Sequence, residues 1–548
     1  MPKKNRNRRL PWLASSLLAG GVLLGTMLGA AAQDAPVSGG TLVYLEQVPH
    51  TALYPPSVGF YPNGGVIAQI ADRLTWQDPK TFEIQPWIAE SWEINADATQ
   101  YTFKLRPGVT FSDGTPLDAA AVAANFDAYG RGNMDLKQTI SEAINNYDHS
   151  EVIDPLTVTF HFSNSSPGFL QATSTITSGL LALKSLAMPI DEFGDATKII
   201  GSGPFIVESE VLGKEINYVA RKDYNWGPST FEHQGAPLLD GIKVIVTPED
   251  GVRIGGLLAG QADIMRVLQA YDEPQVQAVG YNVVAAGTHG MNNAMFLHPE
   301  NPVVSDIRVR RALIAAIDRQ EIVDTVYSEN YPIARSIIAA DVPGFVDLSA
   351  EMTYDQEKAK ALFAEAGWAV GPSGFLEKDG LVLELSGYEA LGQPQNKAML
   401  QLAAQHLAAV GVKLNILPGD AGGRVADNAD PTKTTFEPTM VGRADADVIK
   451  SALHPKNRDL LLQAGGKSAG TVFIDAELNG ILEQIAAETD PTKRLALVEQ
   501  VQRHVIENAY LIPFFEEPQT YAMAPYVHGF AVEAVGRPVF YGTWLAPH

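Results

Sequence analysis

The apolar positions of the stretch Asn301–Arg319 recur at the spacing of a helix. The pattern is i, i+4, i+7, i+8, carried by Val309, Leu313, Ala316 and Ile317. This spacing predicts an amphipathic helix with one buried face. Ser305 or Asp306 comes before the stripe, and either side chain can cap the helix. Three arginines lie mostly off the stripe, so we expect a solvated basic edge at Arg308, Arg310 and Arg311.

Alternation of apolar and polar residues predicts strands in the first half of the chain. Tyr101, Phe103 and Leu105 alternate with polar residues, and the run Thr157–Phe162 does the same. The run Gly40–Glu46 follows a segment rich in Pro, Ser and Gly, and it has the composition of a first strand.

The second half of the chain alternates between helices and strands. Apolar residues form a helical stripe between Asn396 and Val410, Gly411 can end that helix, and residues 412–416 then alternate. A helix, a glycine and a strand make one α/β unit. His406 lies beside the stripe, so we expect an interior histidine that hydrogen-bonds within the core.

The first 32 residues differ from the rest. Five basic residues precede an apolar segment that ends in Ala30-Ala31-Ala32, with no acidic residue among them. A basic start, an apolar middle and small residues at the end are typical of a signal peptide. We expect cleavage before Gln33 and export, with a permanent membrane anchor as the alternative.

Charge and cysteine content exclude several kinds of binding partner and of chemistry. The net charge is −23 and would be −28 without residues 1–32. The chain therefore lacks the excess of positive charge that binding to nucleic acid or anionic lipid requires. The sequence contains no cysteine, which excludes disulfides, thiol catalysis and a lipid attached to cysteine. The exported protein is therefore expected to be free in the periplasm.

Signatures of catalysis are sparse. The chain has no Ser-x-x-Lys and no His-Glu-x-x-His, and its 11 histidines show no obvious metal spacing. Adjacent carboxylates such as Glu516-Glu517 are expected on a solvated edge. We expect no enzymatic activity, no metal site and no cofactor.

Two blocks of the sequence carry a resemblance to a known family. The first combines Pro86-Trp-Ile-Ala-Glu-Ser-Trp92 with Tyr101-Thr-Phe-Lys-Leu-Arg-Pro-Gly-Val-Thr-Phe-Ser-Asp-Gly-Thr-Pro116, and the second is Gly201-Ser-Gly-Pro-Phe205. Together with the helix at 301–319, they resemble extracellular solute-binding proteins of family 5, which serve peptide and nickel ABC importers.

The resemblance implies an α/β fold. It is the two-lobed periplasmic-binding-protein type II fold (cluster C), with a small domain inserted in the first lobe. Lobe I would comprise residues 33–76, 200–296 and 510–548, the inserted domain 77–199, and lobe II 297–509. The hinge would lie where the chain crosses near residues 296 and 510.

The resemblance also implies ligand-binding residues. Peptide-binding relatives carry a motif close to Gly-Trp-x-Ala-Asp-Tyr, whose aspartate pairs with the amino terminus of the peptide. Asp445 is the best match to that aspartate, and the neighbouring candidates are Gly442, Arg443 and Ala444. Arginine stands where the family has tryptophan, and at the cleft it would favour an anionic group.

Further candidates lie elsewhere along the chain. Arg335 and Arg424 are weaker candidates for binding a carboxylate. From the first lobe, the cleft could be lined by Tyr44, Gln47, Met291 and Asn293.

The function implied is that of a periplasmic receptor, a monomer that closes on a peptide-like solute. It would deliver this solute to an ABC permease with a cytoplasmic ATPase. The alternatives are a receptor for an opine, a glycoconjugate or a metal chelate, a secreted hydrolase, and a chaperone-like binder of unfolded chains.

Overall fold

The computed structural model describes residues 35–547, except 391–392, 394, 420, 429, 431–432, 459–460 and 464–472. The expected signal peptide, residues 1–32, lies outside the described residues. None of the helices described is long and apolar enough to cross a membrane.

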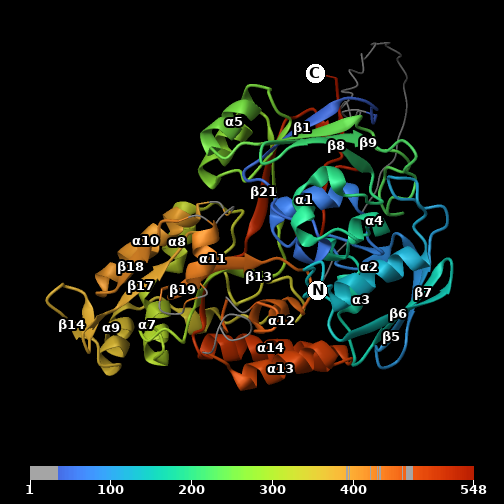
Figure 1. The fold of residues 1–548 in the computed structure, drawn as a ribbon. Helices are drawn as coiled ribbons and strands as arrows, with labels where there is room; N and C mark the ends of the chain where they lie inside the picture. Colours follow the sequence, from blue (N-terminus) through green and yellow to red (C-terminus); the bar gives the residue numbers. More distant parts are fainter. Residues whose placement is uncertain are drawn as a thin grey trace, which may run out of the picture. The chain divides into compact units, whose positions relative to one another are not determined.

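A seven-stranded mixed sheet forms the core of the first lobe (Figure 1). Its strands, in spatial order, are β12 (Asn282–Gly287), β21 (Pro518–Met523), β11 (Ile264–Arg266), β1 (Thr41–Glu46), β10 (Gly241–Val246), β9 (Glu215–Ala220) and β8 (Phe205–Val211). β1 runs parallel to β10 and β11, and all other neighbours are antiparallel. The first strand expected from the sequence is therefore confirmed, and the C-terminal segment completes the same sheet as β21.

The second lobe is built on a three-stranded antiparallel sheet. Its order is β19 (Phe436–Val441), β13 (Met291–Leu297) and β20 (Leu511–Phe515). Every residue of the central strand β13 is buried. The α/β unit predicted at 396–416 is confirmed as α10 (Asn396–Ala409) and β18 (Lys413–Ile416), and β18 pairs in parallel with β17 (Glu384–Gly387).

The chain passes between these two sheets twice. Residues 288–290 join β12 to β13, and residues 516–517 join β20 to β21. We expected the crossings near residues 296 and 510, which are the far ends of β13 and β20. The fully buried run of β13 has no alternation, so the sequence pattern did not indicate to which sheet it belongs.

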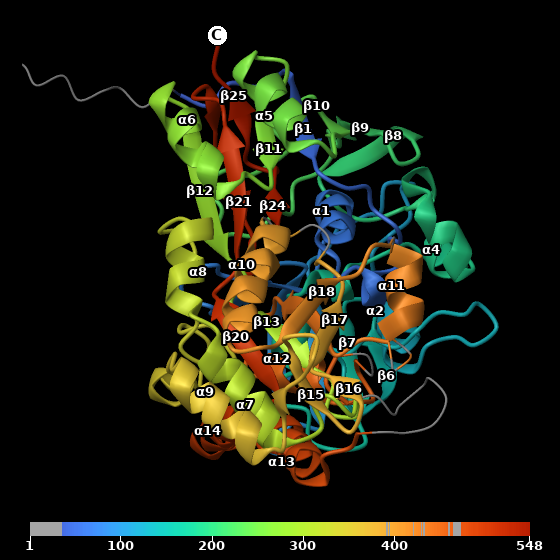
Figure 2. The same ribbon diagram turned by 90° about the vertical axis from the view of Figure 1, so that its left-hand side faces the viewer.

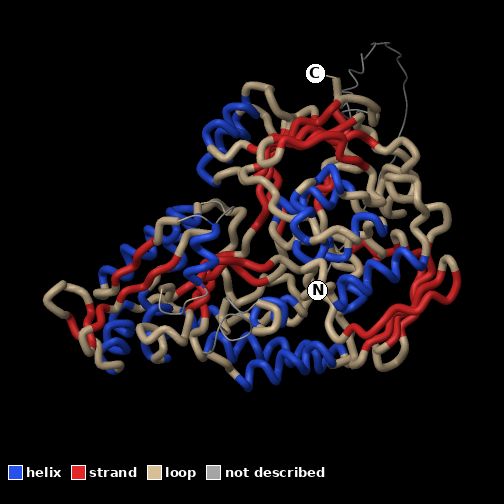
Figure 3. The backbone as a smooth tube through the Cα atoms, in the orientation of Figure 1, coloured by secondary structure: helices blue, strands red, loops and turns tan. Residues whose placement is uncertain are grey.

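A third, antiparallel sheet is inserted in the sequence of the first lobe and is separate from the other two in Figure 3. Its order is β4 (Ala89–Ile94), β5 (Gln100–Leu105), β7 (Thr157–Phe162) and β6 (Tyr147–Asp154). The buried residues of β5 are Tyr101, Phe103 and Leu105, as their alternation predicts. α2 (Ala119–Arg131) packs on this sheet, with Phe126 and Phe160 of β7 4.6 Å apart between ring centroids.

The helix predicted at 301–319 is α7 (Ile307–Ala316), and its stripe is buried. Asp306 caps it by accepting a hydrogen bond of 2.9 Å from the backbone N–H of Arg308. The expected basic edge is wrong for Arg310, which is only 5% exposed. Its guanidinium donates hydrogen bonds to backbone carbonyl oxygens before and beyond the helix, those of Val304, Ser305 and Asn508. A hydrophobic pattern does not show where backbone carbonyl groups lie in the folded chain, so it could not predict that Arg310 is buried.

The other helices cover the sheets, and Figure 2 shows α7, α9, α13 and α14 gathered at one end of the second lobe. They are α1 (Tyr61–Ile70), α3 (Phe169–Ala172), α4 (Leu183–Leu186), α5 (Asp250–Leu258), α6 (Glu273–Ala278), α8 (Arg319–Val326), α9 (Gln356–Glu365), α11 (Ala421–Asn428), α12 (Val448–Leu453), α13 (Ala476–Ala487) and α14 (Pro491–Glu507). The 3-10 helices are η1 (Pro55–Ser57), η2 (Ile176–Ser178), η3 (Ile190–Gly194), η4 (Ala196–Lys198), η5 (Ala270–Asp272) and η6 (Ser349–Met352).

Short strand pairs complete the fold. They are β2 (Thr75–Gln77) with β3 (Ile84–Pro86), β22 (Val527–His528) with β25 (Trp544–Leu545), β23 (Ala531–Val532) with β24 (Pro538–Val539), and the ribbon β14 (Ala369–Val370), β15 (Leu376–Lys378) and β16 (Leu381–Val382).

His406 of α10 is buried as expected, and it hydrogen-bonds to Glu321 at 3.0 Å.

Candidate functional site

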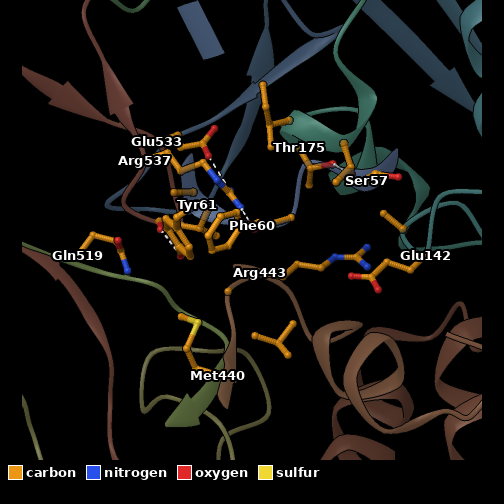
Figure 4. Close-up of a pocket in the computed structure, with 18 of the residues that line it drawn as sticks. Ser57, Phe60, Tyr61, Glu142, Thr175, Met440, Arg443, Gln519, Glu533 and Arg537 are labelled. Carbon is orange, nitrogen blue, oxygen red and sulfur yellow. Dashed lines mark hydrogen bonds and ion pairs between the residues drawn. The ribbon is translucent and has the colours of Figure 1, made fainter. Parts of the chain in front are cut away.

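A cavity of about 610 Å³ lies between the lobes. The first lobe lines it with the start of α1, with β2 and with the chain after β21, and the second lobe with the end of β19 and the turn after it. The inserted domain adds the segment from α3 to η2. Figure 4 shows Phe60, Tyr61 and Arg537 facing Met440 and Arg443 across the cavity. The described residues that line it include six arginines and three glutamates. What the cavity can bind therefore depends on which of these charges are already balanced by a partner in the protein.

Tyr61 stands at the centre of the first-lobe wall. It begins α1, and its hydroxyl donates a 2.7 Å hydrogen bond to the backbone oxygen of Val535. The guanidinium of Arg537 lies 4.5 Å from the centre of the Tyr61 ring, and that of Arg266 lies 6.0 Å from it. Both distances are within the range of a cation–π interaction. Burial raises the pKa of the Tyr61 phenol, which therefore stays neutral.

Two buried arginines share one buried carboxylate beside Tyr61. Arg73, Glu533 and Arg537 are between 1% and 5% exposed, and all three line the cavity. Glu533 pairs with Arg73 and, at 2.9 Å, with Arg537. Burial opposes ionisation of Glu533, but the two arginines outweigh it and lower its pKa. This Arg73–Glu533–Arg537 cluster therefore carries a formal charge of +1.

The charge of Arg266, in contrast, is fully balanced by a partner. Its guanidinium makes two hydrogen bonds to Glu46, of 2.8 and 2.7 Å, and donates a third of 2.7 Å to Gln519. A bidentate pair of this kind satisfies both partners. Arg266 thus orients Gln519 at the cavity wall and brings no excess charge.

Glu517 is a buried carboxylate at the crossing from β20 to β21. It lines the cavity, is 3% exposed, and accepts a 2.7 Å hydrogen bond from Nδ2 of Asn293. Burial raises its pKa to about 7, against the opposing effects of that hydrogen bond and of Arg266. Among the described residues, no arginine, lysine or histidine pairs with it within 4.0 Å. The expectation of a solvated Glu516-Glu517 edge is therefore wrong for Glu517, because the turn that carries it is enclosed between two sheets.

Arg443 joins the second lobe to the inserted domain. Its Nε donates a 3.0 Å hydrogen bond to Gln171, and its Nη1 donates one of 3.0 Å to Ser451. Gln171 in turn donates to Gln77, whose amide donates a 2.8 Å hydrogen bond to the backbone oxygen of Ala444. The result is a closed ring of polar contacts across the cleft.

Two aspartates after β19 pair with Arg494 of α14. Asp445 lies 3.2 Å from Nη2 of Arg494, and Asp447 pairs with the same nitrogen and lies 3.8 Å from Arg443. Two cations thus face two anions, which makes this network formally neutral. Asp445 is therefore engaged inside the second lobe.

The predicted site residues fall into two groups. Gly442 and Arg443 line the cavity, as does the weaker candidate Arg424, which pairs with Glu437. The structure does not place the others among its lining residues. These are Asp445, Ala444, Arg335, Tyr44, Gln47, Met291 and Asn293.

Each of the residues outside the lining has another environment. Arg335 pairs with Asp347 at the surface, and Gln47 hydrogen-bonds to Asp250. Tyr44 and Met291 are buried in the cores of the two lobes. Asn293 acts on the cavity through Glu517.

Sequence reasoning missed Arg73, Glu517, Glu533 and Arg537. Arg73 and Glu533 are 460 positions apart, and only the return of the C-terminal segment to the first lobe brings them together. The one local signal was the crossing itself, because residues that join two lobes commonly line the cleft between them. Among the residues that the structure describes, no three His, Asp or Glu side chains gather in a way that could hold a metal ion.

Comparisons with known proteins agree with this architecture. The family model of bacterial extracellular solute-binding proteins, family 5 Middle, matches residues 83–447. Heme-binding protein A of Haemophilus influenzae is 26% identical over 86% of this chain and 86% of that protein. The dipeptide-binding protein of Escherichia coli K12 is 27% identical over 74% of this chain and 77% of that protein.

Solved structures share the fold. The oligopeptide-binding protein AppA from Bacillus subtilis, in complex with a nonapeptide, superposes with a TM-score of 0.79 at 20% identity, covering 94% of this chain and all of that one. NikA from Brucella suis, in complex with Fe(III)-EDTA, gives 0.75 at 24% identity, covering 93% and 100%. The expected two-lobed α/β fold is confirmed. The chain belongs to the bacterial extracellular solute-binding proteins of family 5.

Proposed function

We propose that this protein is a monomeric receptor that closes its two lobes around a short, zwitterionic, peptide-like solute. Membership of the family makes it the solute-binding component of an ABC importer, outside the cytoplasmic membrane. The class of solute and the residues that hold it are the proposal.

The observation that carries the proposal is that one cavity is walled by both lobes and by Glu517, in one of the two crossings between them. Glu517 lies in one crossing, and Asn293, which binds it, follows directly after the other. A solute held there contacts both lobes only when they are closed. Binding energy then shifts the open and closed populations, which is the mechanism of hinge closure. We place the hinge at residues 288–290 and 516–517.

Size and chemistry favour a short solute. A cavity of about 610 Å³ lies within the usual range of roughly 300–1,000 Å³ for small-molecule sites. Its walls combine the aromatic surfaces of Phe60, Tyr61 and Trp76 with charged and amide side chains. This combination suits a molecule with apolar side chains and charged ends. Arg443 and Gly442 are proposed to contact it from the second lobe.

An anionic solute is the second candidate. Six arginines and three glutamates line the cavity, which favours a polyanion such as an opine or a metal chelate. Relatives with such ligands are known, including AgaA in complex with agropinic acid. Most of these arginines are matched by a carboxylate, however, so only the Arg73–Glu533–Arg537 cluster keeps an excess positive charge, of one.

Enzymatic activity is not part of the proposal. One spacing typical of serine hydrolases does occur, Gly466-Lys-Ser-Ala-Gly470, contrary to our expectation that such signatures would be missing. It lies outside the described residues, and nothing is built on it. A cavity of defined size also argues against a general binder of unfolded chains.

Native mass spectrometry of protein purified from the periplasm without refolding tests the proposal. We expect one copy of the chain, starting at Gln33, with one added mass that is released on denaturation and fragments as a short peptide. A polyanion or a chelate in its place would support the second candidate. Several chains per particle, or turnover of chromogenic ester and peptide substrates, would contradict the proposal.

A further inference from the structure

Two charges on the walls of the cavity lack a counter-charge among the residues that the structure describes. One is the carboxylate of Glu517, and the other is the excess positive charge of the Arg73–Glu533–Arg537 cluster. Buried charges in proteins are ordinarily paired, because an unpaired one loses its hydration without compensation. A ligand that supplies both counter-charges would remove both penalties.

Glu517 has the environment of a cation acceptor. Its carboxylate is buried, lines the cavity, and receives the amide of Asn293 on one oxygen. Asn293 also donates to Gln393, another residue at the cavity, at 2.8 Å. The carboxyl group is thus held in place by a neutral donor, so its negative charge, when it is ionised, is not balanced by that donor.

The Arg73–Glu533–Arg537 cluster has the complementary environment. Glu533 offsets the charge of one of the two guanidinium groups. The remaining positive charge faces only aromatic rings and a backbone oxygen, that of Gly59, which accepts a hydrogen bond of 2.8 Å from Arg537. In the described part of the chain, the Nε atoms of Arg73 and Arg537 are buried without a hydrogen-bond partner. Over the described ranges, Glu533 is the carboxylate that pairs with these guanidinium groups, and the second positive charge is not neutralised.

The other charged groups of the cleft do not call for a ligand. Arg443 and Arg494 are balanced by Asp445 and Asp447. Arg424 pairs with Glu437. Arg458 pairs with Glu142, with both carboxylate oxygens engaged. An amine bound to Asp445 would have to displace Arg494, so Asp445 is not the acceptor that the sequence suggested.

We propose that Glu517 receives the ammonium group of the solute and that the Arg73–Glu533–Arg537 cluster receives its carboxylate. This inference rests on the proposed function and specifies the orientation of the solute in the same cavity. The peptide amine would bind the first lobe at its crossing, and not the aspartate after β19.

Tyr61 lies near both proposed subsites. Its ring is 4.5 Å from the guanidinium of Arg537, and the charge of Glu517 also acts on its hydroxyl. The solute would pass over Tyr61, with its side chains toward Phe60 and Met440 (Figure 4).

The first test uses the wild-type protein, freed of bound solute, and isothermal titration calorimetry. An Ala-Xaa dipeptide library identifies the best binder, which is then compared with its N-acetyl and its C-terminal amide forms. We expect each blocked form to bind at least about tenfold more weakly, the loss typical of one charged hydrogen bond. Equal binding of the N-acetyl form would overturn the role of Glu517. Equal binding of the amide would overturn the role of the cluster, without any mutation.

The second test assigns each end to its residue. Glu517→Gln should lose the preference for the free amine and keep the preference for the free carboxylate. Arg537→Gln should do the reverse. The matched controls are Glu300→Gln, a partly buried carboxyl outside the cavity lining whose pKa burial also raises to about 7, and Arg503→Gln, on the exposed face of α14. Both controls should keep both preferences.

The outcomes separate the inference from the proposed function. Tight dipeptide binding with the amine preference intact in Glu517→Gln would overturn the inference and leave the function standing. A folded wild-type protein that binds no member of the library would overturn both. If Arg537→Gln does not fold, the wild-type comparison of acid with amide still decides the matter.

Discussion

Nδ2 of Asn293 lies 2.7 Å from Oε2 of Glu517, and each of these residues lies in or next to one of the two segments that join the lobes. Asn293 is in β13, just after the first crossing, and Glu517 is in the second crossing. The hydrogen bond ties the crossings together at the wall of the cavity. A ligand that binds Glu517 would therefore act directly at the proposed hinge.

The affinity for an amine-bearing solute is predicted to increase with pH around neutrality. Burial raises the pKa of Glu517 to about 7, so below that pH the carboxyl is largely neutral and attracts an ammonium group weakly. Above it, the carboxylate is charged and binding is tighter. The charged and titratable groups that act on it are Arg266, Tyr61, Tyr327 and Tyr331. Burial raises the pKa of each of these tyrosines, so they do not titrate in this range.

Calorimetry between pH 5.5 and 8.5, in buffers of different ionisation enthalpy, measures this effect. Near pH 7, binding should release a fraction of a proton, because the ammonium group favours the charged carboxylate. Glu517→Gln should show neither the slope nor the proton release. An unchanged pH profile in that variant would assign the effect to another group.

Gly442 is predicted to be essential for closure. A Cβ at this position would lie 2.6 Å from the Tyr61 hydroxyl, which its hydrogen bond to Val535 holds in place. Gly442 belongs to the second lobe and Tyr61 to the first, so the clash arises only in the closed form. Gly442→Ala should weaken ligand binding by about 1–3 kcal/mol, the usual cost of overpacking. Stability toward urea should change by less than about 0.5 kcal/mol.

Gly255→Ala is the matched control for this substitution. Gly255 lies in α5, and a Cβ there meets no atom within 4 Å. It should bind ligand like the wild-type protein and be slightly more stable, since alanine favours a helix over glycine. Wild-type affinity in Gly442→Ala would show that Tyr61 moves aside on closure.

Asp447 and Asp445 are predicted to differ sharply in their contribution to stability. The side chain of Asp447 is 3% exposed, and that of Asp445 is 19% exposed, although both pair with Arg494. Burial opposes ionisation of Asp447, but Arg494 and Arg443 outweigh it and lower its pKa. Asp447→Asn leaves buried cations unmatched and should cost about 3–5 kcal/mol. Asp445→Asn should cost at most about 1 kcal/mol.

Urea titrations at several pH values check this difference. Since the pKa of Asp447 is lowered on folding, its stabilising effect is present above its ordinary pKa and is lost as the pH falls through the lower folded value. The wild-type protein should therefore lose stability in acid, and Asp447→Asn should lose less. Equal destabilisation by both substitutions would contradict the proposed difference in burial.

The hydrophobic pattern predicted local structure well and tertiary pairing poorly. The stripe of α7 and the alternation of β5 report which face of one element is buried, and the structure confirms both. Arg310 and Glu517 are buried for reasons of tertiary structure, because their partners come from other parts of the chain. Gly442 and Arg443, from the motif after β19, line the cavity, and their role in binding stays a prediction. The motif could not show that Arg494, 49 positions later, pairs with Asp445.

The contact between Arg458 and Glu142 is predicted to stabilise the closed form modestly. Nε and Nη2 of Arg458 donate hydrogen bonds of 3.1 and 2.8 Å to the two oxygens of Glu142, joining the second lobe to the inserted domain. Their side chains are 32% and 29% exposed, so solvent screens the pair. Such pairs contribute about 0.2–1 kcal/mol, which corresponds to an affinity change of up to about fivefold.

A double-mutant cycle tests this contact. Arg458→Ala and Glu142→Ala should each weaken binding by that amount, and the double variant should lose no more than either one. Small-angle scattering should show a larger radius of gyration for the ligand-free variants. About 0.5 M salt should reduce the difference from wild type, because it shortens the screening length. The exposed pair Arg503 and Glu499, within α14, is the control that should leave affinity unchanged. Additive losses in the double variant would mean that the two residues act separately and that closure does not depend on their pairing.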